Sequence, residues 1–272
     1  DSDTYKRAHR RSSPSCHSVC KLRVGHVMRK LLLTFVCGMA LLAQPAAAKS
    51  LVEKVRDATA ILYSQSASGG MRMHCTATVF EAHDRDDKKG YLLATAAHCV
   101  AIDDLITSKV KVSGASFFIS FDNEPKQVFH PVHVEGAGFQ SRGDDFAVLH
   151  AFTDEEWEVL ELGDVSSLKP MDEVLNVSAP AGLGLQVLKG HISLVSINRP
   201  VKTWGLNWQS AMLVNLSSGP GASGSAVVSI DQEKIVGFVV GGVTGNPTTV
   251  VLTVNRFRLF LQAARLQMYA WW

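Results

Sequence analysis

The sequence predicts an all-β protein built from two similar halves. Three observations support this fold class: short apolar runs separated by polar or glycine-rich turns, a second series of such runs after residues 168–170, and no long helical pattern between them. Short strands at this spacing are typical of antiparallel sheets, because parallel sheets alternate their strands with helices. The two halves are expected to join near residue 165.

The predicted elements follow in order along the chain. Apolar residues at 51, 52 and 55 predict one or two helical turns at the start. The first half is expected to place strands at 60–63, 74–80, 91–95, 117–121, 128–134 and 146–149. The second half is expected to place them at 174–177, 186–197, 208–216, 226–230, 235–243 and 249–254. Apolar residues from Phe257 to Leu266 recur at helical spacing, which predicts a terminal amphipathic helix over 255–272.

The charge of the chain is unevenly distributed. Of its 272 residues, 46% are hydrophobic and 19% charged, as in ordinary globular proteins. Residues 1–48 hold 8 of the 27 Lys and Arg and 2 of the 25 Asp and Glu, which leaves 19 basic and 23 acidic residues in 49–272, a net charge of −4. That part therefore lacks the basic character of a nucleic-acid-binding protein, and no nucleic-acid partner is expected.

Residues 28–48 have the pattern of a secretory signal peptide. Met28-Arg29-Lys30 precedes an apolar run over 31–42, and Pro45 and the small residues Ala46 and Ala48 follow before position 49. The run is shorter than a membrane span, and the small residues lie where a signal peptidase cleaves. A buried or anchoring helix is the alternative. We expect a secreted or periplasmic protein with no membrane attachment after cleavage, and we interpret residues 1–27 as upstream sequence outside the fold.

Two cysteines remain once the leader is set aside. Cys16 and Cys20 lie upstream and Cys37 lies in the signal peptide, so the mature region keeps Cys75 and Cys99. An even pair in an exported chain favours a disulfide over a metal site, which needs more ligands at closer spacing. The other metal-like spacing is His130 with His133; without a third ligand nearby these are interpreted as ordinary strand or loop histidines. We expect no metal and no cofactor.

Three short segments carry chemistry, and they occur in an informative order. Thr95-Ala96-Ala97-His98-Cys99 ends an apolar run, Asp145 precedes the apolar run at 146–149, and Gly221-Ala222-Ser223-Gly224-Ser225 places a serine between glycines. Each segment alone has an ordinary structural interpretation as a core position, a strand edge or a turn. Together, in the order His, Asp, Ser, they resemble the chymotrypsin/trypsin clan of serine peptidases.

The resemblance covers nearly all of residues 50–266 and implies a fold and a mechanism. It implies two antiparallel six-stranded Greek-key barrels, over 49–165 and 166–254, within one protease domain at 49–272. His98, Asp145 and Ser223 would act as base, orienting acid and nucleophile in a serine endopeptidase, a hydrolase of protein or peptide substrates. The backbone N–H groups of Gly221 and Ser223 would form the oxyanion hole. Cys75 would pair with Cys99, and a protein inhibitor is a further class of partner.

Two departures from the clan's pattern matter. Ala222 stands where pancreatic enzymes have an acid that pairs with a new N-terminus, so activation by precise trimming is not expected. Val240 stands where many relatives have a serine that binds the triad aspartate, so Asp145 must find other donors. Asp144 is the competing acid, but the clan places the acid directly before the strand, which favours Asp145.

The primary specificity pocket is expected to be neutral. By resemblance its floor and walls are Ser217, Ser218, Val239, Val240, Gly241 and Gly242. The run around Gly241-Gly242 and Ser223-Gly224-Ser225 most resembles the bacterial glutamyl-endopeptidase-like branch, yet Val239 replaces the pocket histidine of that branch. We expect cleavage after small or medium apolar residues, unless a loop at 181–185 or 199–208 places a charge in the pocket.

Two other classes of function compete with this one. A catalytically silent binding protein on the same fold is the main alternative, although such proteins usually lose a triad member and this chain keeps all three. A protease-chaperone would need a peptide-binding domain after the catalytic one, and only the predicted helix follows residue 254.

Overall fold

A computed structural model of the chain describes residues 48–85, 88–104, 109–122, 126–197, 202–203, 206–207, 211–243 and 245–268. The chain divides at Ala48/Lys49 into two units, and the described residues belong almost entirely to the second. The expected signal peptide and upstream sequence lie outside the described residues. No helix in the described part of the chain is long and apolar enough to cross a membrane.

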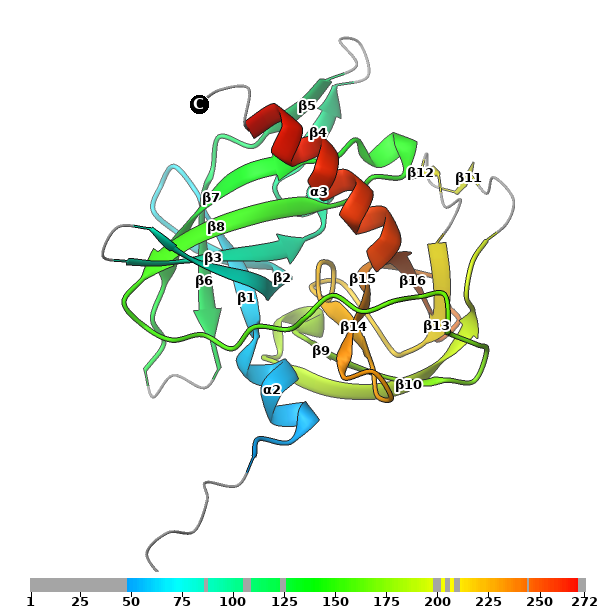
Figure 1. The fold of residues 1–272 in the computed structure, drawn as a ribbon. Helices are drawn as coiled ribbons and strands as arrows, with labels where there is room; N and C mark the ends of the chain where they lie inside the picture. The colour runs from blue at the N-terminus through cyan, green and yellow to red at the C-terminus, as the bar shows by residue number, and fades with distance from the viewer. Residues whose placement is uncertain are drawn as a thin grey trace, which may run out of the picture. The chain divides into compact units, whose positions relative to one another are not determined.

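The second unit contains two closed antiparallel barrels of six strands each (Figure 1), which confirms the predicted fold class. The first barrel has the strand order β1-β2-β3-β8-β7-β6. Its strands are β1 (Thr59–Gln65), β2 (Met71–Arg85), β3 (Lys88–Thr95), β6 (Ser116–Phe121), β7 (His130–Ala137) and β8 (Ala147–Thr153). A hairpin of β4 (Ala101–Asp104) and β5 (Lys109–Val112), which the sequence did not predict, lies outside the barrel.

The second barrel has the order β10-β13-β16-β15-β14-β9. Its strands are β9 (Glu173–Ser178), β10 (Gln186–Leu194), β13 (Ala211–Asn215), β14 (Ala226–Ser229), β15 (Lys234–Gly242) and β16 (Thr248–Thr253). A short pair, β11 (Lys202–Thr203) and β12 (Leu206–Asn207), stands apart from it. The start of the strand predicted at 208–216 lies outside the described residues.

Among the described residues, two α-helices flank the barrels. The short helix α2 (Leu51–Asp57) begins at a capping box, in which Ser50 accepts a hydrogen bond from the Glu53 backbone and the Glu53 side chain accepts one from the Ser50 backbone. The helix α3 (Val254–Met268) follows β16, where the sequence predicts a terminal helix. It contacts β15 of the second barrel, and Phe260 and Ala264 lie against Gly136 of β7 in the first.

A buried aromatic cluster joins these elements. Phe146, Phe238 and Phe257 are each at most 1% exposed, and their rings lie 4.8 to 6.3 Å apart. They come from the segment before β8, from β15 and from α3. The cluster therefore fixes the segment that carries Asp145 against the second barrel and the terminal helix.

Candidate active site

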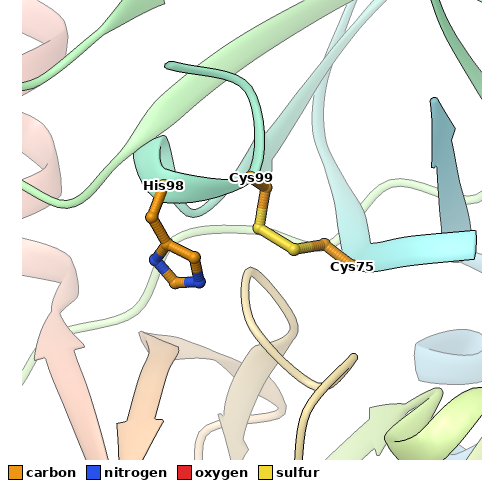
Figure 2. A group of neighbouring side chains, drawn as sticks. All are labelled: Cys75, His98 and Cys99. Carbon is orange, nitrogen blue, oxygen red and sulfur yellow. A yellow bond between two sulfur atoms is a disulfide. The ribbon is translucent and has the colours of Figure 1, made fainter. Parts of the chain in front are cut away.

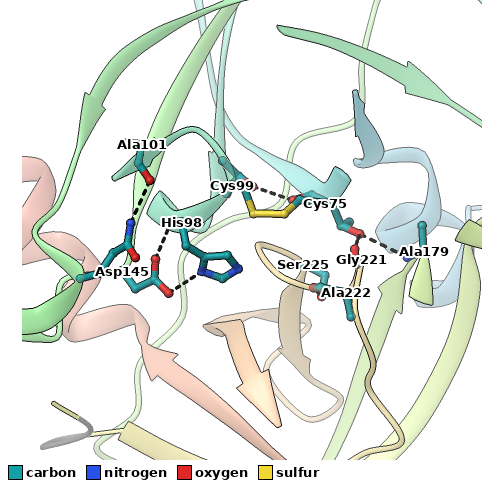
Figure 3. The surroundings of a disulfide bond; sticks show 12 residues. Cys75, His98, Cys99, Ala101, Asp145, Ala179, Gly221, Ala222 and Ser225 are labelled. Carbon is teal, nitrogen blue, oxygen red and sulfur yellow. Dashed lines mark hydrogen bonds and ion pairs between the residues drawn. A yellow bond between two sulfur atoms is a disulfide. The ribbon is translucent and has the colours of Figure 1, made fainter. Parts of the chain in front are cut away.

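His98 and Asp145 are brought together by the ends of two neighbouring strands. Thr95 at the end of β3 pairs with Ala147 at the start of β8, so the 3-10 turn η1 (Ala97–Cys99) lies beside Asp145. His98 Nδ1 is 2.7 Å from Asp145 Oδ2, and the His98 backbone N–H donates to Asp145 Oδ1 at 2.9 Å (Figure 3). Both carboxylate oxygens of Asp145 thus contact His98. The His98 backbone N–H supplies a second hydrogen-bond donor to Asp145, whereas Val240 has no side-chain hydroxyl that could do so.

Asp145 and His98 differ in how much of each is exposed to solvent. Asp145 is 3% exposed, whereas the His98 side chain is 36% exposed. A buried carboxylate that accepts the Nδ1 proton holds the neutral ring with Nε2 unprotonated. The ring can therefore accept a proton at Nε2 on its open side.

Asp144 has a different partner. Arg256 of α3 donates through Nε to Asp144 Oδ1 at 3.0 Å and through Nη2 to the Arg142 backbone carbonyl at 2.9 Å. Adjacent residues in extended chain point in opposite directions, so only one of the two acids can face His98. Asp145 is that residue.

A disulfide joins Cys75 of β2 to Cys99 of η1, as the resemblance implied. Figure 2 shows the His98 ring beside it, and the ligand-type atoms of His98, Cys75 and Cys99 lie within 4.8 Å of one another. This cluster is no metal site, because the two sulfurs are bonded to each other and the imidazole is bound to Asp145. The bridge instead anchors the histidine turn to β2.

The loop that carries Ser223 begins with a type II turn. The Ala222 N–H donates to the Gly219 carbonyl at 3.0 Å across Pro220 and Gly221, and Gly221 has φ +99°. Such a turn favours proline second and needs a positive φ, hence glycine, third. A Cβ on Gly221 would lie 2.4 Å from the Ala179 carbonyl oxygen. Both the positive φ and this close contact therefore require glycine at position 221.

The loop docks on the first barrel through Thr76, a residue to which the sequence analysis gave no role. The Thr76 N–H donates to the Ser223 carbonyl at 2.9 Å, and its Oγ1 donates to the Gly221 carbonyl at 2.8 Å and accepts from the Ala179 N–H at 3.2 Å. On the other side, a Cβ at Gly224 would lie 2.3 Å from both the Thr76 carbonyl oxygen and Thr95 Oγ1. These contacts place Ser223 beside the segment that leads to His98.

Buried polar side chains support the loop from behind. Asn176 of β9 donates to Ser225 Oγ at 2.9 Å and to the Ala226 carbonyl at 2.8 Å, and Ser225 Oγ donates to the Ala222 carbonyl at 2.7 Å. Within the described part of the chain, the backbone N–H groups of Gly221 and Ser223 donate to no backbone carbonyl. Two amides of the loop are thus available to a ligand.

A pocket of about 450 Å³ opens next to Ser223. Its lining includes four of the predicted residues together with Asn246 and Thr248; the four are Ser218, Val239, Gly241 and Gly242. Ser217 is exposed and Val240 is buried, and neither lines the pocket. No side chain in the described lining is charged. The segment 199–208, where the sequence analysis left room for a charge, lies mostly outside the described residues.

The hydroxyl of Ser218 is held in place by a neighbour. Ser218 Oγ is 2.7 Å from Thr249 Oγ1, which donates to the Leu216 carbonyl at 2.9 Å. The Ser218 N–H also donates to the Leu216 carbonyl at 3.0 Å, and Ser218 rather than Ser217 faces the pocket. Linear sequence could not decide between them.

His74 lies close enough to His98 for the charges of the two side chains to interact. Burial lowers the pKa of His74, the charges of Arg72 and His98 lower it further, and a hydrogen bond with the Cys99 backbone opposes the shift. His74 therefore favours its neutral form. A neutral neighbour does not oppose the positive charge that His98 would gain as a base.

The two barrels, and the His98, Asp145 and Ser223 segments that they bring together, have the architecture of the chymotrypsin/trypsin clan. The family model "trypsin-like peptidase domain" matches residues 75–238, and the chain belongs to that family. A search of curated proteins found no match.

Solved structures show the same fold. The HtrA-type protease AlgW with a tripeptide matches with a TM-score of 0.59 and 18% identity over 78% of this chain and 62% of that chain. AlgW with a decapeptide matches with a TM-score of 0.58 and 17% identity over 79% of this chain and 65% of that chain. The matched part thus spans less than two thirds of these proteases. At this identity the likeness concerns the fold.

Proposed function

We propose that this protein cleaves peptide bonds through an acyl-enzyme formed on Ser223. Ser223 Oγ attacks the carbonyl carbon of the scissile bond while His98 Nε2 accepts the hydroxyl proton and Asp145 stabilises the resulting imidazolium. The tetrahedral intermediate then expels the amine, which takes the proton from His98. Water, deprotonated by His98, attacks the ester, releases the acid and restores the Ser223 hydroxyl. The bidentate contact between His98 and Asp145 is the observation that carries this proposal.

The amides of Gly221 and Ser223 form the oxyanion hole in this mechanism. The support for this role is that the Pro220 and Ala222 carbonyls, which share peptide planes with the Gly221 and Ser223 N–H groups, are held in place. The Pro220 carbonyl accepts from the Ala181 N–H at 2.7 Å, and the Ala222 carbonyl accepts from Ser225 Oγ at 2.7 Å. Donors that are oriented before the reaction stabilise the developing oxyanion without reorganisation, and each one is worth about 3 kcal/mol of barrier.

The proposed substrate is an extended peptide with a small or medium apolar residue before the scissile bond. The uncharged lining supports this, because burying an uncompensated charge would cost several kcal/mol. In addition, β14 pairs with β15 only as far as Phe238, so Gly241 and Gly242 pair with β16 alone. Their other edge suits the addition of a peptide strand.

We also place the protein outside the cytoplasm, in a periplasm or in the medium. The support is the signal-peptide pattern of residues 28–48 together with the disulfide between Cys75 and Cys99, since such bonds persist in oxidising compartments. The closeness to the glutamyl-endopeptidase-like branch stays a prediction.

Replacement of the nucleophile tests the mechanism. Ser223→Ala should lower casein hydrolysis by about four decades or more and abolish labelling by a fluorophosphonate, while the unfolding transition stays unchanged. Ser193→Ala, an exposed serine on β10, is the matched control and should behave as wild type. A wild-type protein that takes up no label and cleaves nothing would instead identify a silent binding protein.

Profiling with a peptide library tests the specificity. We expect Ala, Val, Leu or similar neutral residues before the cleaved bond, because each buried CH₂ contributes about 0.8 kcal/mol in a pocket that offers a charged group no partner. A profile dominated by Arg, Lys or Glu would contradict the proposed pocket. It would point to a charge contributed from 199–208.

A further inference from the structure

The outer face of the first barrel carries a group of polar side chains that catalysis does not use. His83 on β2 pairs with Gly90 on β3, and His150 on β8 pairs with Leu92 on β3 and with His133 on β7. Directly paired residues lie on the same face of a sheet. These histidine side chains therefore project from β2, β8 and β7 onto one surface, with β3 lying between β2 and β8.

Gly90 allows the two histidines to meet. β3 lies between β2 and β8, whose backbones are therefore roughly 10 Å apart. A Cβ on Gly90 would lie 2.4 Å from His83 Nε2, so the imidazole of His83 occupies the space that any other residue would fill. The ring crosses β3 at this point and reaches His150.

The two imidazoles face each other through equivalent atoms. His83 Nε2 is 3.1 Å from His150 Nε2, and His150 Nδ1 is 3.0 Å from Glu135 Oε1. If the Glu135 carboxylate accepts the Nδ1 proton, the neutral ring of His150 has a lone pair at Nε2, directed at His83. A carboxylate that orients a histidine in this way is the usual second partner of a metal-binding imidazole.

The distances match those of two ligands on one ion. Zinc binds imidazole nitrogen at about 2.0–2.1 Å, so two nitrogens in tetrahedral coordination lie about 3.3 Å apart. To admit the ion, the rings would separate by about 0.2 Å, and His83 would carry its proton on Nδ1, so that both Nε2 lone pairs face the ion. We propose that His83 and His150 bind a zinc-type divalent transition-metal ion, with Glu135 as the carboxylate that orients His150.

The surroundings indicate the class of ion. The His150 side chain is 10% exposed and that of Glu135 28%, so the site is set into the surface while His83 is only partly covered. Imidazole nitrogens favour zinc, copper or nickel over calcium and magnesium, which prefer oxygen. Water would fill the remaining coordination positions of the ion.

The site would act as a clamp within the first barrel. The bound ion would link β2 to β8 across β3, and β3 leads into the turn of His98 while β8 follows Asp145. Gly90 lies five residues before Thr95, roughly 16 Å along the strand, so the ion would not touch the triad. It would raise the stability of the barrel without entering the reaction.

Calorimetric titration with zinc chloride tests the site. The full-length chain with Ser223→Ala, which prevents self-digestion, is used with its free thiols alkylated, because Cys16, Cys20 and Cys37 could also bind zinc. We expect His83→Gln to bind one zinc ion fewer than this parent. His191→Gln, on β10 of the second barrel, is the matched control and should keep the parent's stoichiometry.

Two further variants keep the test independent of folding. Glu135→Gln should keep the site with affinity lowered by about 10–100-fold. Gly90→Ala keeps every ligand but displaces the His83 ring, and should lose the zinc site with little change in the unfolding transition of the metal-free protein.

Cobalt in place of zinc should give the visible absorption of nitrogen-bound tetrahedral cobalt only when both histidines are present. Equal zinc stoichiometry in the parent, His83→Gln and Gly90→Ala would overturn the proposal and leave a hydrogen-bonded histidine pair.

Discussion

Thr76 shows how a single residue connects the two barrels at the site. Its backbone and its hydroxyl contact the Ser223 loop and Ala179, so one side chain of the first barrel orients the loop of the second. The hydroxyl is fully buried, and both of its partners would be left without a hydrogen bond if it were removed. Thr76 is therefore a positioning residue for the loop that carries Ser223, the proposed nucleophile.

Replacement of this hydroxyl should damage both stability and turnover. Thr76→Val keeps the shape but leaves the Gly221 carbonyl and the Ala179 N–H unpaired, which should cost about 1–3 kcal/mol in the free energy of unfolding. Because the loop is then less well oriented, kcat/KM should fall roughly tenfold to a hundredfold, mostly through kcat. Urea unfolding and steady-state kinetics measure the two effects. Thr76→Ser restores the hydroxyl and should be close to wild type; equal kinetics for Val and Ser would contradict the assigned role.

At the scale of elements, the site depends on the short turn η1 being tied to β2. The turn has three residues and no side-chain cap, and the disulfide from Cys99 reaches across to Cys75. The chain between the two cysteines forms a closed loop with a sequence separation of 24. The crosslink thus restricts the unfolded chain and positions His98 in the folded one.

Removal of the disulfide should lower the free energy of unfolding. The double variant Cys75→Ser, Cys99→Ser should lose about 3 kcal/mol in the free energy of unfolding in the chain-entropy account. Urea titration of oxidised wild type, of wild type with reductant and of the variant measures the difference. Wild type with reductant should approach the variant. If all three unfold at the same urea concentration, the bond does not stabilise the fold.

In the molecule as a whole, the start of the described chain is held by residues that do not belong to the Ser223 loop. Lys49 Nζ is 2.7 Å from Asp57 and 3.0 Å from Glu158, and these hydrogen bonds raise the pKa of its ammonium. Ser50 caps α2. Ala222, by contrast, is fully buried and offers no charge to a new N-terminus.

Activity should therefore not depend on the exact N-terminus. A protein that begins at Lys49 and one that keeps residues 46–48 should have kcat/KM values within about threefold, or ~0.7 kcal/mol in barrier. Steady-state kinetics on purified samples of both, with termini checked by mass spectrometry, makes the comparison. An extended form that is inactive until trimmed would show that a new amine completes the site.

The fold class, the order His98, Asp145, Ser223 and the two paired cysteines could be predicted from the sequence. These features depend on neighbours along the chain: alternation within a strand, an apolar run before His98, glycines around Ser223. Such patterns are legible because a strand or a tight turn imposes its requirements on consecutive residues.

Only the tertiary structure decided which side chains meet across the barrels. It assigned Asp144 to Arg256, turned Ser218 rather than Ser217 into the pocket, and brought Thr76 to the Ser223 loop. It also placed His83 over Gly90 against His150, 67 residues away in sequence. The physical reason is register: closing a barrel fixes each strand against its neighbours, and a shift of one residue would send every side chain to the opposite face.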